Sequence, residues 1–280
     1  MTILIIIIGT LALWIILAQL IWKRRISDSK AKKLFAKKGI ALFSGTVDAN
    51  CFQIHYARTG DDYLPTLFFV HGTPGSWKSY EEFLQDKELL SKYRLIAVDR
   101  PGFGYSQFGD GRNLEEQSKI ISHLIKTLSN NRPVYLIGAS FGGPVVTRLA
   151  IDNPGLFSGI FLLAPALDPA TEIYYFWRPL FFKTPLKYLV PGVWKSNNEE
   201  LWYLIKDLEL MAPLLPSIDC PAWVLQGDKD KAVPVSNAYY AKKMLVNAKP
   251  LYLKIIPGGS HSVTDENYML IKNILMGLEE

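Results

Sequence analysis

Short apolar runs alternate with helical patterns along most of this 280-residue chain, and this alternation constrains the fold more than any other feature. Each run is closed by a glycine, proline or aspartate signal, as is typical of strands in βα units. Strands are expected at 52–57, 66–70, 95–98, 134–137, 159–163, 222–226 and 251–256. Helices should begin near Lys78, Leu114, Phe141, Val235 and Asp265. This order predicts an α/β domain with a largely parallel sheet.

One segment, residues 165–216, interrupts the alternation. It contains several prolines and is crowded with aromatic residues. We interpret it as an inserted helical cap above the sheet. Its aromatic side chains could line an apolar pocket or pack the cap onto the core, and both roles are expected to occur.

The strand expected at 134–137 leads into the sequence Gly138-Ala139-Ser140-Phe141-Gly142, which fits the pattern G-x-S-x-G. A helical pattern follows it directly. In such a strand-turn-helix the serine occupies a strained turn, and glycine on either side lets the backbone pack closely. The pattern predicts Ser140 as a nucleophile, although a serine in an ordinary tight turn would also satisfy it.

A serine hydroxyl becomes nucleophilic when a histidine accepts its proton. His261 is the best placed of the four histidines, because it lies in a glycine-containing loop after the last expected strand and before the final helix. His55 and His123 fall within an expected strand and an amphipathic helix, where packing roles are favoured. His71 is expected to hold its own loop in place.

A third residue must orient the imidazole and stabilise its charged form. The loop after the strand at 222–226 offers Asp228 and Asp230, and we favour Asp230 because Asp228 suits a turn. Asp168 is a further candidate. The resulting chain order, Ser140, Asp230, His261, is the order of the hydrolases that use G-x-S-x-G.

Negative charge on a tetrahedral intermediate requires hydrogen-bond donors. The loop His71-Gly72-Thr73-Pro74-Gly75 follows a strand directly and is rich in glycine and proline. We expect the backbone amides of Thr73 and Phe141 to form an oxyanion hole.

Taken together, these motifs resemble the α/β-hydrolase superfamily of serine hydrolases of the esterase and lipase type. The matching segments are HGTPGS at 71–76, DRPGFGYS at 99–106, GASFGG around Ser140, GDKDKAVP around Asp230 and GGSH ending at His261. The resemblance covers the chain from about Phe52 onward, except for the cap. It implies an eight-stranded sheet, an active site beneath the cap, and no metal or cofactor.

The activity expected from this resemblance is hydrolysis of a carboxylic ester, with a small apolar or lipid-like substrate, through an acyl-enzyme. An amide, peptide or carbon-carbon bond hydrolase would use the same residues, and a non-catalytic binding protein on the same fold is the alternative of a different class. The segment at 71–76 also resembles epoxide hydrolases and haloalkane dehalogenases. Those enzymes have an aspartate at the position of Ser140, which argues against both activities.

The N-terminal run from Thr2 to Trp22 contains no charged residue and would be about 30 Å long as a helix. We therefore expect residues 1–22 to form a single-pass membrane anchor, rather than a signal peptide, because the run follows the first Met directly and ends in Trp22-Lys23-Arg24-Arg25. The basic segment after it favours a cytoplasmic catalytic domain.

Residues 23–38 contain eight Lys or Arg and one acid, a charge of +7, so the rest of the chain carries −2 of the net charge of +5. The rest of the chain has no basic excess, so nucleic-acid binding is not expected. Residues 23–40 could lie on anionic lipid headgroups or form a solvated linker helix. The expected organisation is an anchor at 1–22, a basic segment at 23–40 and a hydrolase domain at 41–280. With two cysteines, no disulfide framework is expected, and no obligate protein partner is evident.

Overall fold

One sheet runs through the molecule in the strand order β1-β2-β4-β3-β5-β6-β7-β8. The computed structural model describes residues 2–20, 25–49 and 51–278. Within that part of the chain β1 and β2 pair antiparallel, as do β2 and β4, and the other neighbours pair parallel. The strands are β1 (Phe43–Asp48), β2 (Gln53–Thr59), β3 (Thr66–Val70), β4 (Arg94–Val98), β5 (Val134–Ala139), β6 (Gly159–Leu163), β7 (Ala222–Gly227) and β8 (Leu251–Ile256).

This architecture is the α/β-hydrolase fold that the sequence predicts, with its eight-stranded, mostly parallel sheet. The bounds of β3, β6 and β8 agree with the expected strands, and the other expected strands shift by one or two residues. Every residue of β3, β4 and β6 is buried. Strands covered by helices on both faces are continuous apolar runs, which explains why the sequence pattern located them.

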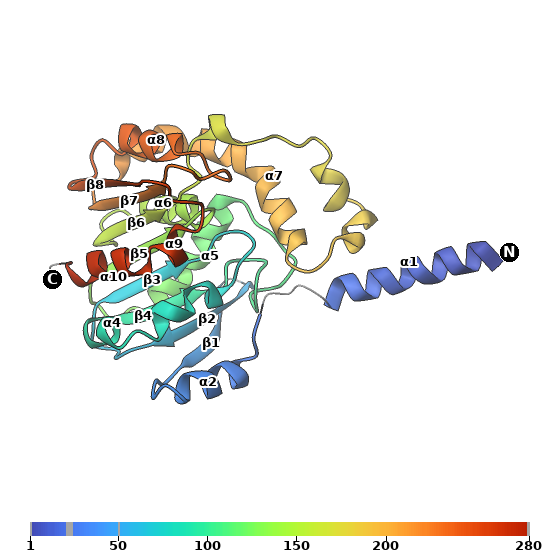
Figure 1. Ribbon diagram of the computed structural model, residues 1–280, viewed down its shortest axis with the longest axis horizontal. Coiled ribbons are helices and arrows are strands. Elements are labelled where there is room, and N and C mark those ends of the chain that lie inside the picture. The colour runs from blue at the N-terminus through green and yellow to red at the C-terminus, as the bar shows by residue number, and fades with distance from the viewer. Residues whose placement is uncertain (1, 21–24, 50, 279–280) are drawn as a thin grey trace.

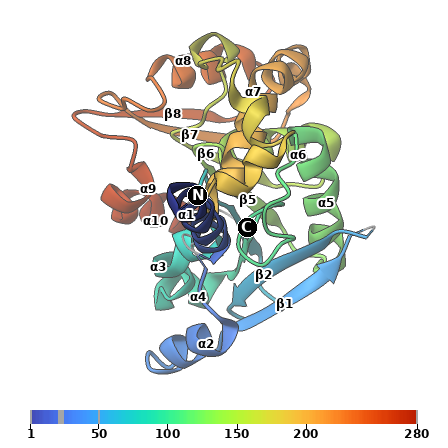
Figure 2. The same ribbon diagram turned by 90° about the vertical axis from the view of Figure 1, so that its right-hand side faces the viewer.

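Helices cover both faces of this sheet (Figures 1 and 2). Alternate side chains of β3 enter two separate cores: Phe68 and Val70 pack with α5, α6, α7 and α8, and Leu67 and Phe69 pack with the helices of the other face. The bounds on the first face are α5 (Leu114–Thr127), α6 (Gly142–Asp152), α7 (Trp194–Met211) and α8 (Ser236–Met244). On the second face they are α2 (Asp28–Ala36), η1 (Trp77–Tyr80), α3 (Glu81–Leu84), α4 (Lys87–Lys92), α9 (Val263–Glu266) and α10 (Tyr268–Met276).

The segment expected to form a cap leaves the sheet after β6 and returns at β7. Its principal element is α7, whose C-terminal half packs Leu204, Leu208 and Met211 into the first core and whose other end extends beyond the sheet toward the short helices before it (Figure 1). Those short 3-10 helices are η2 (Pro169–Thr171), η3 (Arg178–Phe181) and η4 (Pro185–Leu189), and η5 (Ala212–Ser217) follows α7. Each begins with a proline in its first turn, where the missing N–H is not needed.

The basic segment that follows the N-terminal run contributes a helix to the α/β body. Its helix α2 buries Ala31 and Phe35 in the second core, and the Phe35 ring lies 6.2 Å from that of Trp77. Neither alternative drawn from the sequence anticipated this packing, because two apolar residues in a basic stretch are a weak signal. Lys23 and Arg24 lie outside the described residues.

The predicted single-pass anchor at residues 1–22 is not supported. In the described ranges, the structure contains no helix with the length and apolarity that a membrane crossing requires. Residues 2–20 form the 19-residue helix α1 (Thr2–Leu20), and Ile21 and Trp22 lie outside the description. The cytoplasmic orientation depended on that span and is not supported either.

Helix α1 projects away from the body, with its C-terminal end against the cap (Figure 1). The indole nitrogen of Trp14 donates to the Leu189 carbonyl at 3.0 Å, and the Gly192 amide donates to the Ala18 carbonyl at 2.9 Å. Ala18 is buried, whereas most of the isoleucine and leucine side chains of α1 are exposed. The helix is therefore attached to the cap and presents an apolar surface.

Candidate active site

Ser140 lies at the turn between β5 and α6 in the left-handed region, with φ of +53°. Its neighbours explain the two glycines of the motif. A Cβ atom on Gly138 would lie 2.2 Å from the Gly142 carbonyl oxygen, and one on Gly142 would lie 2.1 Å from the Val70 carbonyl oxygen. Only glycine fits at these positions, and the tight turn leaves the Ser140 side chain partly exposed at the end of the sheet.

His261 reaches Ser140 from the loop between β8 and α9. Its Nε2 atom lies 3.0 Å from the Ser140 Oγ, and its Nδ1 atom lies 2.7 Å from Oδ2 of Asp230. A carboxylate accepts only, so Nδ1 carries the proton of a neutral ring and Nε2 is free to accept the serine proton. The structure thus brings together the three side chains that the sequence selected.

The Asp230 carboxylate is buried and held by several donors. Its Oδ1 accepts from the amides of Ala232 and Val233, both at 2.8 Å, and its Oδ2 accepts from the Gln226 side chain at 2.9 Å. These contacts hold the carboxylate in position independently of its contact with His261. Gln226 was not among the residues selected from the sequence, since an amide at the end of a strand carries no motif.

The two other acids considered for this role lie in local turns. Asp228 Oδ1 accepts from the Gly258 amide at 2.7 Å, which joins the β7 and β8 loops. Asp168 Oδ1 accepts from the Ala170 amide at 3.0 Å and caps η2. Both side chains thus have structural partners.

The candidate oxyanion loop lies directly beside Ser140. A Cβ atom on Gly72 would be 3.0 Å from the Ser140 Cβ, so Thr73 follows a point of close approach. Phe141 precedes α6, where the first amides of the helix point outward and lack partners in the helix. Across the described residues, no protein group accepts a hydrogen bond from the backbone amide of Thr73 or Phe141. These two donors are available to a ligand.

His71 holds this loop in place. Its ring is fully buried, with Nδ1 2.6 Å from the Gly72 carbonyl oxygen and Nε2 3.0 Å from the amide nitrogen of Arg100, which donates to it. Burial and the nearby Arg100 guanidinium lower the pKa of His71 well below its ordinary value. The ring is therefore neutral, as acceptance of the Arg100 N–H by Nε2 requires.

The remaining histidines lie elsewhere. His55, on β2, is buried with Nδ1 2.8 Å from Asp99 Oδ2 and Nε2 3.3 Å from Asp28 Oδ1. Burial alone would lower its pKa, but the two carboxylates outweigh it and raise the pKa. His123 lies partly exposed on α5. Within the described part of the chain, no cluster of three or more His, Cys, Asp or Glu could hold a metal ion.

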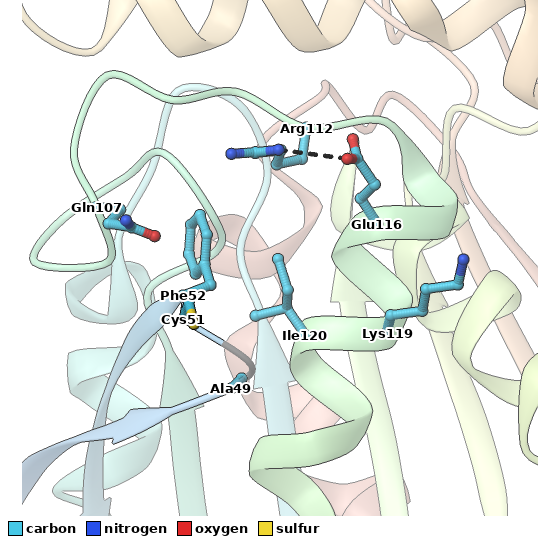
Figure 3. Close-up of a pocket in the computed structure, with 8 residues that line it drawn as sticks. All are labelled: Ala49, Cys51, Phe52, Gln107, Arg112, Glu116, Lys119 and Ile120. Carbon is cyan, nitrogen blue, oxygen red and sulfur yellow. Dashed lines mark hydrogen bonds and ion pairs between the residues drawn. The ribbon is translucent and has the colours of Figure 1, made fainter.

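A separate pocket of about 290 Å³ lies between the β1–β2 turn and α5 (Figure 3). Its polar lining includes the ion pair between Arg112 and Glu116, whose closest atoms are 3.3 Å apart. Ser140, Asp230 and His261 are not among its lining residues. The candidate chemistry therefore takes place elsewhere.

Comparisons with known proteins agree with this fold. A sequence model described as "alpha/beta hydrolase fold" matches residues 65–188. The serine hydrolase BPHL of Mus musculus is 27% identical over 278 residues, covering 90% of this chain and 93% of that protein. Epoxide hydrolase 1 of Caenorhabditis elegans is 30% identical over 105 residues, covering 36% of this chain and 25% of that protein.

Among solved structures, a membrane phospholipase A described as a bacterial virulence factor superposes with a TM-score of 0.64. It is 18% identical, and the superposition covers 99% of this chain and 98% of that one. Similarity at this identity shows a shared fold.

Proposed function

We propose that this chain is a member of the α/β-hydrolase superfamily and a serine hydrolase that cleaves carboxylic esters of apolar or lipid-like substrates. The observation that carries the proposal is the chain of contacts from Asp230 through His261 to Ser140, at 2.7 and 3.0 Å. A serine on a strained turn, a histidine in the required tautomer and a buried carboxylate are the parts that acyl transfer needs.

The reaction begins when Ser140 Oγ attacks the ester carbonyl carbon and His261 Nε2 accepts the hydroxyl proton. Asp230 stabilises the imidazolium that results. The amides of Thr73 and Phe141 donate to the oxyanion of the tetrahedral intermediate, each contributing about 3 kcal/mol in comparable sites. Collapse of the intermediate expels the alcohol, which takes the proton from His261. Water then attacks the acyl-enzyme with His261 as the base, and the acid is released with Ser140 restored.

The cap supports an apolar substrate. Asn197 of α7 donates to the Thr73 hydroxyl at 3.0 Å, so the cap lies beside the proposed oxyanion loop. Tyr174, Phe176 and Trp177 are exposed in the segment before α7. Exposed aromatic side chains on a cap that contacts this loop favour a substrate with an apolar acyl chain.

We also propose that the protein binds lipid surfaces through α1 and the adjoining cap. Residues 173–195 carry four Lys or Arg and no acid, among several exposed aromatic residues. Basic and aromatic side chains together favour the interfacial region of an anionic bilayer. The solved structure described as a membrane phospholipase A, similar in fold over 99% of this chain, adds support.

Other activities are the alternatives to this proposal. Hydrolysis of an amide or a carbon-carbon bond would proceed through the same attack by Ser140. Several relatives are epoxide hydrolases, among them the one from Caenorhabditis elegans. Epoxide opening in that family uses an aspartate, and this chain has Ser140 in its place. A non-catalytic protein of this fold would show no reaction at Ser140.

A substrate panel tests the proposed reaction. Purified protein and its Ser140→Ala variant are assayed on p-nitrophenyl esters of increasing chain length, acylglycerols, lysophospholipids, aryl amides and styrene oxide. We expect turnover of the esters, increasing from short to medium chains, and none by the variant. Faster turnover of amides than of matched esters, or turnover by the variant, would contradict the proposal.

A further inference from the structure

Arg100 follows β4 directly, and its side chain is fully buried although it carries a charge. On one side the guanidinium supports the proposed oxyanion loop: Nε donates to the His71 carbonyl at 2.7 Å, and Nη2 donates to the Gly72 carbonyl at 3.1 Å. Its carbon Cζ also lies 4.7 Å from the centre of the Phe141 ring. One guanidinium therefore contacts both segments that provide the proposed oxyanion donors.

On its other side the same guanidinium binds the cap. Glu200 lies on α7. Nη1 of Arg100 donates to its Oε2 at 2.6 Å and Nη2 donates to its Oε1 at 3.0 Å, so the ion pair is bidentate. Glu200 is also fully buried. The planar arginine fork matches a carboxylate in this arrangement, which holds two segments in a defined geometry. Gln117 of α5 completes the set, accepting from Nη1 at 2.8 Å.

A second contact joins the same helix to the same loop. Asn197 lies three residues before Glu200, on the same face of α7. Its side-chain amide donates to the Thr73 hydroxyl at 3.0 Å. The cap thus reaches the loop twice, directly through Asn197 and indirectly through Glu200 and Arg100.

We propose that Asn197, Glu200 and Arg100 are positioning residues through which the cap helix α7 sets the geometry of the oxyanion loop. The inference rests on the proposed acyl transfer and adds a role for the cap in the chemical step. If the cap were displaced from the body, Glu200 would no longer hold the Arg100 guanidinium. The His71 and Gly72 carbonyls that accept from this guanidinium would then be less firmly positioned. Donors to the oxyanion matter most in the transition state, so the loss should appear in kcat rather than in KM.

Two neighbouring asparagines provide a matched test. Asn197 and Asn198 are both buried, and each donates one side-chain hydrogen bond, but Asn198 donates to the Arg178 carbonyl within the cap at 3.0 Å. We expect Asn197→Ala to lower kcat on a p-nitrophenyl ester about 10-fold with KM changed less than about 2-fold. Asn198→Ala should leave kcat within about 2-fold. Equal kcat losses in the two variants would overturn the proposal.

The ion pair is tested by Glu200→Gln beside Glu199→Gln. Glu199 is the adjacent residue and accepts from the Gly111 amide at 3.1 Å, away from the loop. The readout is inhibition by a trifluoromethyl ketone, which forms a tetrahedral oxyanion adduct, compared with inhibition by the product acid. We expect Glu200→Gln to weaken inhibition by the ketone at least about 10-fold and inhibition by the acid little. Glu199→Gln should be inhibited by both ligands as the wild type is. Equal weakening of both ligands would overturn the inference.

Thr73→Val keeps the test decisive if a cap variant fails to fold. It removes the hydroxyl that accepts from Asn197 and leaves the Thr73 amide in place. We expect it to reproduce the kcat loss of Asn197→Ala, and the double variant to lose no more than either single one. Additive losses would contradict the coupling. A wild-type protein without Ser140-dependent ester turnover would instead refute the proposed function, so the two failures are distinguishable.

Discussion

At the scale of single residues, the candidate site depends on which carboxylate meets His261. Asp228 and Asp230 lie two residues apart on the loop after β7, yet only Asp230 turns its oxygen to the imidazole. The difference follows from the amides of Ala232 and Val233 and the side chain of Gln226, which all donate to Asp230. Residue type and spacing reduced the candidates for the acid to a few aspartates. These local donors explain why the Asp230 carboxylate faces His261.

Replacing each aspartate by asparagine separates their roles. Asp230→Asn presents a possible donor to Nδ1 and favours the wrong histidine tautomer, so we expect kcat to fall about 10³- to 10⁴-fold. Asp228→Asn retains an oxygen for the Gly258 amide and should change kcat less than about 3-fold. Steady-state kinetics on one ester compares the two. A larger loss in Asp228→Asn would move the acid to that position.

At the scale of elements, the cap helix α7 is attached to the body by several carboxylates. Glu200 pairs with Arg100, Glu199 accepts from the Gly111 amide, and Asp207 accepts from the Leu114 amide at 2.8 Å. Burial is the main cause that raises the pKa of Glu199 from 4.5 to about 7, and it also raises the pKa of Asp207 from 3.8 to about 6. The attachment of the cap should therefore respond to pH near neutrality.

The sign of this response follows from proton linkage. A raised pKa means that the folded protein binds more protons than the unfolded chain between about pH 4.5 and 7, so the stability contributed by Glu199 falls as pH rises through that window. We expect Glu199→Gln to reduce the drop in Tm between pH 5 and pH 8, and Glu209→Gln, an exposed site on the same helix, to leave it unchanged. Thermal unfolding of each variant at both pH values measures this drop in Tm. An undiminished drop in Glu199→Gln would contradict the argument.

The elements that the sequence located best are those with one dominant signal. Strand β3 has four consecutive apolar residues after Thr66, whereas β1 has an exposed Phe43 and a glycine at Gly45 and was not anticipated from the residues themselves. The same limit applies to the site. Ser140, His261 and Arg100 belong to motifs, but Glu200 is 100 residues from Arg100 and lies in no motif, so only the fold shows that the two pair.

At the scale of the whole molecule, the apolar helix α1 and the cap form one exposed surface. Trp14 and Ala18 join the helix to the cap through hydrogen bonds with Leu189 and Gly192. Burying such a surface in lipid would remove apolar area from water on both elements at once. The proposed lipid binding therefore depends on α1 and the cap together.

Flotation of the full-length protein with vesicles tests this surface. Ile5 and Ile8 of α1 are exposed, and asparagine at both should weaken partitioning roughly 100-fold, from about 1.5 kcal/mol or more per side chain. Asparagine at Leu156 and Val246, which are exposed on the body, is the matched control and should change it little. Binding should be stronger to phosphatidylglycerol-containing vesicles than to pure phosphatidylcholine. Similar flotation of both variants would show that α1 does not bind lipid.

The central claim, that Ser140 is an activated nucleophile, is tested most directly by mapping the adduct of a fluorophosphonate probe. The probe reacts with a serine only where a base and an oxyanion site activate it. We predict one adduct per chain, located by peptide mass spectrometry on Ser140, absent in Ser140→Ala and slowed at least about 10³-fold in His261→Ala. An unlabelled wild-type protein, an adduct at another residue, or labelling at the same rate in His261→Ala would contradict the account.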